Sequence, residues 1–431
     1  MRKQNTALPA QSWLVLAMAG LLTACGGGSS SDNPATDDHD HAHSGRLLYS
    51  LTDNTTLKVY DQAEKSFENL ESDADGNAAQ LVMADNGLSA AVYSRTEKTV
   101  QIVYSGLHAE EETATTEAEH GEHEHAEMLS TNLDSVDQVV GTRGHFSALR
   151  LGATQLLPTA DAEAAGLNFE AALNTPASQT YPALVLEEAH DLKLFFAGNQ
   201  AVIYEGTESK QTFACTTPSG HAEAGELTVL NCDGNAHFVL AEEHDGHHHF
   251  YTGAVEFDAA TTVSGLTSNG HDIVAWNSTG AWALAAEEHS HVDAVSIATA
   301  EPEVAVHAEA LTLDLNGAAI CTAAFSTEDE DTLGVLTNNN QLHLINLADQ
   351  STRSIALDES TTVGCDHLRL ATGPEAFMVA DSDAGLVYLV DSHDGRPYHI
   401  HSRLRDNSIH TLENMVFMHA IDASHDHDHV H

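Results

Sequence analysis

Histidine is the residue type in this sequence with the clearest capacity for chemistry. The chain of 431 residues contains 30 histidines, many of them in short clusters interleaved with Asp and Glu. A neutral imidazole binds zinc, copper and nickel well, whereas calcium and magnesium prefer shells of oxygen atoms. Carboxylates nearby can complete such a shell or orient an imidazole through its other ring nitrogen. The clusters therefore predict metal binding.

Five clusters carry this prediction, and all fall in predicted turns, linkers or tails. They are His39, His41 and His43; His120, His123 and His125; His244, His247, His248 and His249; His289 and His291; and His425, His427, His429 and His431. The alternative is that they are solvated acidic loops in which His is merely frequent. Recurrence in five places favours ligands. Zinc is preferred over copper, because no Met-rich motif accompanies the clusters, and nickel is also less favoured.

The other histidines are weaker candidates. His221, in SGHAEAGE, could be a ligand or a turn residue. Four more stand beside predicted strand starts, where a role in satisfying backbone groups is expected: His145, His190, His271 and His367. His237 and His343 fall inside predicted strands and are expected to pack or to face outward.

Enzymatic signatures are lacking, so the sequence predicts that the protein is not an enzyme. It contains no HExxH, GxSxG or P-loop motif, and no GxGxxG after a strand. A lyase or hydrolase with a metal in a central channel is the catalytic alternative. It would need ligands on inner strands, such as His271 and His367.

The elements that must position these histidines are short β-rich runs separated by turns. Residues 227–298 contain two tandem units of this kind, with strands expected at 227–231, 236–241 and 250–257, then at 272–276, 281–286 and 292–298. The repeat of about 45 residues is typical of a propeller blade. Because equivalent turns of neighbouring blades share a face, His244–His249 are expected to lie near His289 and His291.

Counted along the whole chain, these units predict an all-β, single β-propeller. Central hairpins fall near Leu48, Ala91, Leu149, Leu194, Phe238, Leu284, Val335 and Phe377, which gives eight blades, or seven if the irregular third unit is not a blade. In that unit, residues 161–173 could form a short helix. A final strand at Met415–Ile421 is expected to complete the first blade and close the ring. A pair of β-sandwiches is the rival fold.

The first 25 residues are predicted to be a targeting segment. Arg2 and Lys3 precede an apolar run, and Leu22–Cys25 resembles the lipobox of bacterial lipoproteins. That resemblance implies cleavage before Cys25, lipidation of Cys25 and, with Gly26 next, a place on the periplasmic side of a Gram-negative envelope at the outer membrane. The expected domains are a signal peptide (1–25), a His/Asp-rich linker (26–45), the propeller (46–422) and a His-rich tail (423–431).

Charge and cysteine content restrict the partners and the chemistry further. The net charge is −49, with 65 acidic and 16 basic residues, which disfavours nucleic acid and anionic membrane surfaces and favours cations. The only membrane contact expected is the lipid anchor. Cys215, Cys232, Cys321 and Cys365 allow three disulfide pairings, of which Cys215–Cys232 with Cys321–Cys365 is the simplest. Zinc ligation by these cysteines is the alternative, although no CxxC pair supports it.

Three stretches together carry a resemblance to a known family. They are HDHAHSGRLLYSLTDN, the strand pair ending in VQIVYSG with its acidic His-rich insert, and FACTTPSGHAEAGELTVLNCDG. They resemble the AztD-like family of periplasmic zinc metallochaperones over most of the chain after Gly45. The resemblance implies a propeller that binds zinc and passes it to the solute-binding protein of a zinc ABC importer; the number of His clusters predicts several zinc ions. It also supports the first two His clusters as ligands and a Cys215–Cys232 disulfide.

The function predicted on these grounds is a lipid-anchored zinc metallochaperone that captures or buffers zinc. Mobile arms would capture the ion, and turns fixed on the ring would hold it before ligand exchange with a partner. The alternative is a propeller scaffold lipoprotein for protein–protein interaction at the outer membrane, in which metal binding is incidental. Deleting every His cluster would leave the function of such a scaffold intact.

Overall fold

A computed structural model describes most of the chain after residue 44. The described residues are 45–52, 56–71, 79–107, 125–131, 133–159, 167, 169–173, 178–244, 247–286, 304–327, 331–373, 376–392 and 397–419. All belong to one compact unit, Ala42–His431. Several predicted features lie outside these residues: the signal peptide with Cys25, the linker, the tail, and His39, His41, His43, His120, His123, His289, His291, His425, His427, His429 and His431.

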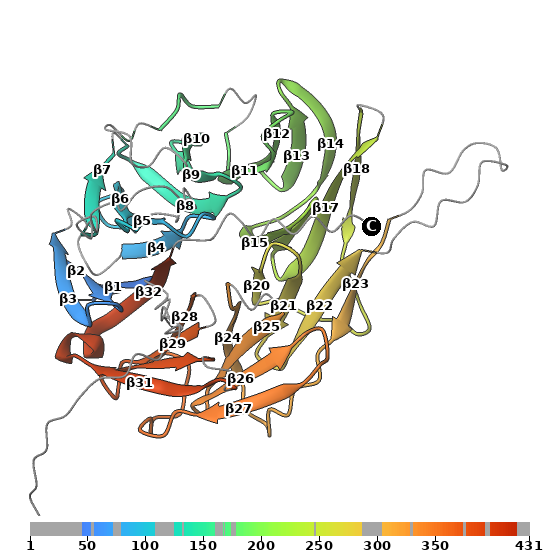
Figure 1. Ribbon diagram of the computed structural model, residues 1–431. Helices are drawn as coiled ribbons and strands as arrows, with labels where there is room; N and C mark the ends of the chain where they lie inside the picture. The colour runs from blue at the N-terminus through green and yellow to red at the C-terminus, as the bar shows by residue number, and fades with distance from the viewer. Residues whose placement is uncertain are drawn as a thin grey trace, which may run out of the picture. The chain divides into compact units, whose positions relative to one another are not determined.

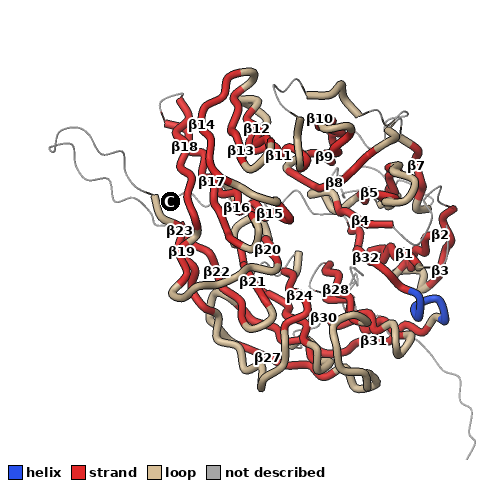
Figure 2. The backbone as a smooth tube through the Cα atoms, turned by 180° about the vertical axis from the view of Figure 1, so that it is seen from behind, coloured by secondary structure: helices blue, strands red, loops and turns tan. Residues whose placement is uncertain are grey.

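Eight sheets follow one another around a ring, as Figure 1 and Figure 2 show. The first four blades comprise β32 (Leu412–His419), β1 (Gly45–Leu51), β2 (Thr56–Asp61) and β3 (Ser66–Glu71); β4 (Ala79–Met83), β5 (Ser89–Ser94), β6 (Val100–Tyr104) and β7 (Glu127–Ser130); β8 (Val136–Thr142), β9 (His145–Arg150) and β10 (Ala153–Pro158); and β11 (Tyr181–Glu187), β12 (Leu192–Ala197), β13 (Gln200–Glu205) and β14 (Glu208–Ala214).

The remaining four blades complete the ring. They comprise β15 (Pro218–Ala224), β16 (Leu227–Cys232), β17 (Asn235–His244) and β18 (His247–Ala254); β20 (Gly265–Ser268), β21 (Ile273–Asn277), β22 (Gly280–Ala286) and β23 (Val306–Ala310), with β19 (Glu256–Phe257) beside β23; β24 (Ile320–Phe325), β25 (Thr332–Thr337), β26 (Gln341–Asn346) and β27 (Thr352–Ala356); and β28 (Leu368–Gly373), β29 (Ala376–Asp381), β30 (Leu386–Asp391) and β31 (His399–Arg405). A short 3-10 helix, η2 (Asn407–Thr411), precedes β32.

The eight-bladed propeller is therefore confirmed, and the rival sandwich pair is wrong. The last strand closes the ring as predicted: β32 pairs antiparallel with β1, from Gly45 opposite His419 onward. The pairing of these two strands buries apolar side chains of both, and Leu48 and Met418 are fully buried. Closure supplies hydrogen-bonding partners to a sheet edge that an open sheet would leave exposed.

The third blade differs from its expected form. Its sheet has three described strands, but an extended segment covers the edge of β10, because Glu170 N donates to Leu156 O and Leu173 N to Thr154 O, both at 2.8 Å. The short helix expected over residues 161–173 is wrong for Leu167 and for 169–173, which are not helical. The open edge of β10 and the burial of Phe169 outweigh the helix propensity of this Ala-rich stretch.

The sixth blade also differs from the sequence-based expectation. The strand that pairs with β22 is β23 (Val306–Ala310), whereas residues 292–298 were expected to form this strand. Residues 292–298 lie outside the described part of the chain. The connection from β22 to β23 is therefore longer than the repeat predicted.

Two disulfides join neighbouring blades. Cys215, just after β14, is bonded to Cys232 at the end of β16, with their Cα atoms 5.1 Å apart. Cys321 on β24 is bonded to Cys365, which precedes β28, with a Cα separation of 5.2 Å. The simplest pairing is thus confirmed, and zinc ligation by these cysteines is wrong.

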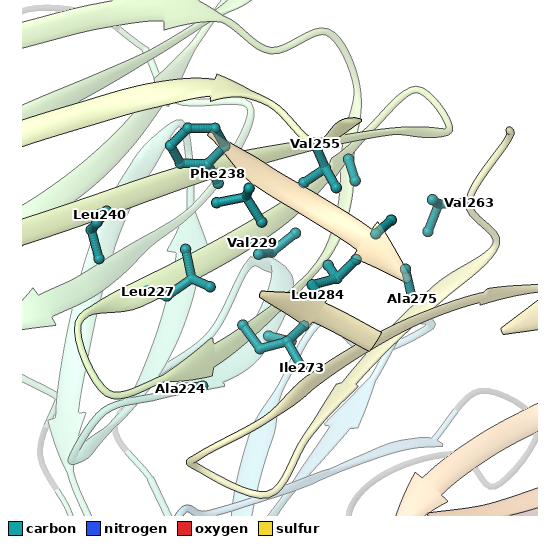
Figure 3. Packing of buried hydrophobic residues seen from close by; sticks show 14 of the residues in the cluster. Ala224, Leu227, Val229, Phe238, Leu240, Val255, Val263, Ile273, Ala275 and Leu284 are labelled. Carbon is teal, nitrogen blue, oxygen red and sulfur yellow. The ribbon is translucent and has the colours of Figure 1, made fainter. Parts of the chain in front are cut away.

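The core lies between the blades, where facing sheets bury alternate side chains. Between the fifth and sixth blades, Val229 and Phe238 pack with Ile273 and Leu284 (Figure 3). Gly253, opposite Phe238 on β18, is required there, since an added Cβ would stand 2.7 Å from the Phe238 ring.

Among the described residues, no helix is long and apolar enough to cross a membrane.

Candidate metal centre

Two blades contribute to a group of four potential ligands. Glu187 ends β11 and His190 lies in the turn before β12, both in the fourth blade. Glu243 and His248 face one another across the β17–β18 hairpin of the fifth blade. One potential ligand atom from each of the four side chains lies within 4.8 Å of the others. The donor set is two imidazole nitrogens and two carboxylate oxygens.

Strand length explains how the hairpin reaches the neighbouring blade. β17 has 10 residues and β18 has 8, longer than the strands that flank them in the blade. Turns after the first and third strands of a four-stranded antiparallel blade project from the same face. The β11–β12 turn is a first turn and the β17–β18 turn is a third turn, so both lie on one face of the ring.

His248 has the most constrained environment in the group. Its side chain is 4% exposed, and its Nε2 lies 2.9 Å from Glu187 Oε2. This is a close ion-pair contact, although the two atoms do not have the geometry of a well-aligned hydrogen bond. A cation shared by Nε2 and the carboxylate would satisfy both atoms.

Aromatic packing and a second histidine hold this arrangement. The His248 ring stacks on Phe250 at a centroid distance of 6.0 Å, and it makes a T-shaped contact with the His190 ring at a centroid distance of 4.6 Å. His190 Nδ1 lies 2.9 Å from Glu187 Oε1. With Nδ1–H donating to the carboxylate, Nε2 of neutral His190 keeps its lone pair for a metal.

The local charge favours a cation. The hydrogen bond to Glu187 raises the pKa of His190. Burial opposes ionisation of Glu187, yet its hydrogen bond with His190 and the nearby imidazoles lower its pKa overall. Glu205 Oε1 also lies 3.9 Å from His248 Nδ1, and Lys210 pairs with Glu205 at 2.8 Å. Three carboxylates thus surround the two imidazoles.

The structure places the other predicted ligands as follows. His249 is exposed on β18 and lies opposite Glu242 in the hairpin. His244 and His247 pair at the end of the same hairpin, and their side chains lie outside the described set. His125, just before β7, has its Nδ1 2.6 Å from Glu68 Oε1 and is 74% exposed. The expected proximity of His244–His249 to His289 and His291 stays a prediction.

His221 belongs to strand β15 and not to a turn. Its Nε2 lies 2.9 Å from Gly141 O, and since a carbonyl can only accept, Nε2 donates. Glu223 Oε1 is 3.8 Å from the same nitrogen. His221 and Glu223 line a cavity of about 610 Å³ together with Arg143 and Asp85.

Sequence reasoning did not assign His190, Glu187 or Glu243 to the site. It gave His190 a role in satisfying backbone groups and took the two glutamates as residues flanking turns. One sequence signal could have found them: EEAH at residues 187–190 has the acid–acid–His pattern of EEH at 242–244 and 287–289. Combined with the rule that first and third turns share a face, this pattern places the turns at 187–190 and 242–244 on the same face of the ring.

The alternative of an enzyme with a metal in the central channel required ligands such as His271 and His367. His271 is exposed in the loop before β21, and His367 is buried before β28. Within the described ranges, neither belongs to a set of three or more potential ligands.

Comparisons with known proteins identify the fold. No family model matches this sequence, and a search of curated proteins finds no match. The structure is similar to apo AztD from Citrobacter koseri, with a TM-score of 0.65, 12% identity, and coverage of 87% of this chain and 97% of that one. A crystal structure of Citrobacter koseri AztD gives a TM-score of 0.62 at the same identity and coverage. At this identity the similarity shows a shared fold.

Proposed function

We propose that this protein is a zinc carrier that holds a zinc ion between Glu187, His190, Glu243 and His248. The observation that supports it most is the buried Nε2 of His248, 2.9 Å from Glu187 Oε2 without the alignment of a hydrogen bond. The same two atoms are suitably placed to become neighbouring ligands of one ion.

The donor set favours zinc among the common divalent ions. Zinc is bound tetrahedrally by imidazole and carboxylate at about 2.0–2.2 Å, which puts neighbouring ligand atoms about 3.4 Å apart. One ligand atom from each of the four side chains already lies within 4.8 Å of the others, so these atoms are close to the spacing that a tetrahedral zinc requires. The described cysteines are all in disulfides, so no thiolate from them competes for a softer ion such as Cu(I).

Partial exposure of the site supports a carrier. The side chains of Glu187 and His190 are 36% and 41% exposed, so an incoming ligand can reach the ion while His248 remains buried. An accessible shell allows ligand exchange, which a closed shell would hinder. The similarity to AztD and the sequence resemblance support delivery to the solute-binding protein of a zinc ABC importer. The lipobox-like segment supports a periplasmic, lipid-anchored location.

A competition titration with a chromophoric zinc chelator tests the proposal. The full-length protein is compared with His190→Ala/His248→Ala and with a control, His307→Ala. His307 pairs with Glu256 at 3.4 Å and lies outside the group. We expect the double variant to lose one tight equivalent of zinc, with affinity at that site falling at least ~10-fold, and the control to keep it. An unchanged titration of the double variant contradicts the proposed site.

Zinc transfer is measured separately. Zinc-loaded protein is mixed with the metal-free solute-binding protein of a zinc importer, separated from it again, and the zinc in each fraction is counted. Transfer faster than spontaneous release is expected for a carrier. Zinc that stays with this protein supports storage and contradicts delivery.

A further inference from the structure

We infer a second, separate zinc site on the eighth blade, formed by Asp391, His399 and His401. The sequence analysis singled out none of these three residues. Their ligand atoms all lie within 4.8 Å of one another. The site is independent of the group between the fourth and fifth blades, since the two share no residue and stand on different blades.

The strand register brings the three side chains together. Asp391 is the last residue of β30 and lies directly opposite His399, the first residue of β31. The register then shifts: Val390 pairs with Ile400 but Leu389 pairs with Ser402, so His401 is the residue that the irregularity inserts. Bulges of this kind re-aim side chains and are frequent beside functional sites.

The exposure of the three residues suits a binding site open to solvent. β31 is the outermost strand of its blade (Figure 1). The side chain of Asp391 is 16% exposed and that of His401 is 46% exposed. The carboxylate of Asp391 is thus shielded from water, which strengthens its attraction for a cation. The imidazole of His401 is accessible, so a cation can reach the site from solvent.

Hydrogen bonding prepares His399 as a ligand. Its Nδ1 lies 3.2 Å from Pro397 O. A carbonyl oxygen only accepts, so Nδ1 carries the proton and Nε2 of the neutral ring keeps its lone pair. Fixing the tautomer through the other ring nitrogen is the usual outer-shell device of metal-binding histidines.

The distance between the His401 imidazole and the Asp391 carboxylate fits a shared metal ion better than a hydrogen bond. His401 Nδ1 and Asp391 Oδ2 are 3.6 Å apart, too long for a good hydrogen bond. Neighbouring ligands of a tetrahedral zinc are separated by about 3.4 Å. Two imidazoles and one carboxylate form a three-ligand set that leaves the fourth position for water or an external ligand. Two nitrogen donors disfavour calcium and magnesium.

An ordinary surface ion pair is the competing explanation. Such pairs contribute little and need only one histidine. The pair of His307 with Glu256, 3.4 Å apart on the sixth blade, has that simple form, with His307 45% exposed. It matches the exposure of His401, and among the described residues it belongs to no group of three or more potential ligands, so it is the control for this site.

The site also has a defined place on the ring. The β30–β31 turn follows the third strand of its blade, as the β17–β18 turn does. By the same rule of turn parity, both zinc sites lie on one face of the propeller. The open fourth position makes the site on the eighth blade the more labile of the two, suited to accept or release an ion by ligand exchange.

The test is a zinc stoichiometry by native mass spectrometry and chelator competition on the full-length protein, with zinc chloride as the probe. We expect His399→Ala/His401→Ala to lose one equivalent that is distinct from the one lost in His190→Ala/His248→Ala, and the quadruple variant to lose two. His307→Ala should lose none. An unchanged stoichiometry in His399→Ala/His401→Ala, or an equal loss in the control, overturns the inference.

A second measurement needs no variant. Zinc should protect His399 and His401 of the wild-type protein from acylation by diethyl pyrocarbonate, read by peptide mass spectrometry, while His307 stays reactive. Equal reactivity with and without zinc overturns the inference. Failure of the proposed function leaves this result untouched, because protection is read at each histidine separately and His190 and His248 report on the other site.

Discussion

At the scale of single residues, His248 combines two properties that usually conflict. It is buried against Phe250, as an apolar ring would be, yet its Nε2 makes no well-aligned hydrogen bond. Burial of an incompletely satisfied nitrogen destabilises the metal-free protein and strengthens the affinity for an ion that satisfies it.

Replacing this ring with one of similar shape separates the two effects. We expect His248→Phe to keep the packing on Phe250, leave the free energy of unfolding of metal-free protein unchanged or raise it by about 1 kcal/mol, and weaken zinc binding at least ~10-fold. Urea unfolding and chelator competition measure the two quantities. His237→Phe on β17 is the control, since His237 stacks on Phe213 and lies outside the group; its zinc affinity should not change. Zinc affinity that survives His248→Phe contradicts the role given to His248.

Residue-level prediction from the sequence succeeded where a histidine lies in a conspicuous cluster and failed where its partners are distant in sequence. His248 was predicted as a ligand because of its His and Glu neighbours. His190 and Asp391 were not assigned to a site, because His190 meets Glu243 and His248 of the next blade, and Asp391 meets His399 and His401 only through the pairing of two strands. Local composition does not reveal a bulge, and it indicates which turns meet only when it is combined with the order of the strands in each blade.

At the scale of elements, Asp406 connects the end of the chain to the first blade. Its Oδ1 accepts from Ser408 N at 2.9 Å and caps η2, while its Oδ2 accepts from Lys58 on β2 at 2.7 Å. Burial opposes ionisation of Asp406, but the hydrogen bonds from Lys58 and Ser408 lower its pKa overall. One carboxylate thus fixes both the helix start and its contact with β2.

We expect Asp406→Ala to destabilise the protein by about 1–3 kcal/mol, the combined loss of a cap and a shielded ion pair. A carboxyl whose pKa is lower in the folded state stabilises fully above its unfolded value of about 3.9, and this contribution disappears as pH falls through the folded pKa. The difference between wild type and variant in urea unfolding should therefore shrink at acid pH. The exposed pair of Lys98 with Asp137, at 2.7 Å, provides the control, and Asp137→Ala should cost under ~1 kcal/mol. Equal effects of the two substitutions contradict this account.

Strands were predicted correctly wherever apolar and polar residues alternate and turn residues separate the runs. The hairpins near Val335 and Phe377, in the blades of β24 to β26 and β28 to β30, are examples. Prediction failed at residues 167–173 because Leu167 and Phe169 are buried against the third blade, and the edge of β10 takes backbone hydrogen bonds from Glu170 and Leu173. Those long-range contacts override the helix propensity of the Ala-rich stretch. The strand Val306–Ala310 was missed since a longer connection breaks the repeat period.

At the scale of the whole molecule, disulfides reinforce the ring between blades. Cys321→Ser/Cys365→Ser opens a loop that spans 44 residues. We expect a loss of about 2–4 kcal/mol in the free energy of unfolding, with zinc affinity at His190 and His248 unchanged, because neither is on the seventh or eighth blade. Urea unfolding and chelator competition decide this. A parallel loss of zinc at that site contradicts the independence of the two regions.

The pairing of β1 with β32 also has a consequence for the order in which the protein is made. The first blade cannot be finished until the last strand has been synthesised, since β32 comes from the other end of the chain. Until then β1 presents an unpaired edge with apolar residues such as Leu47 and Leu48, which invites pairing with another chain. Contacts so distant in sequence form slowly. Ring closure by β32 therefore leaves the edge of β1 unpaired in the growing chain until β32 has been made.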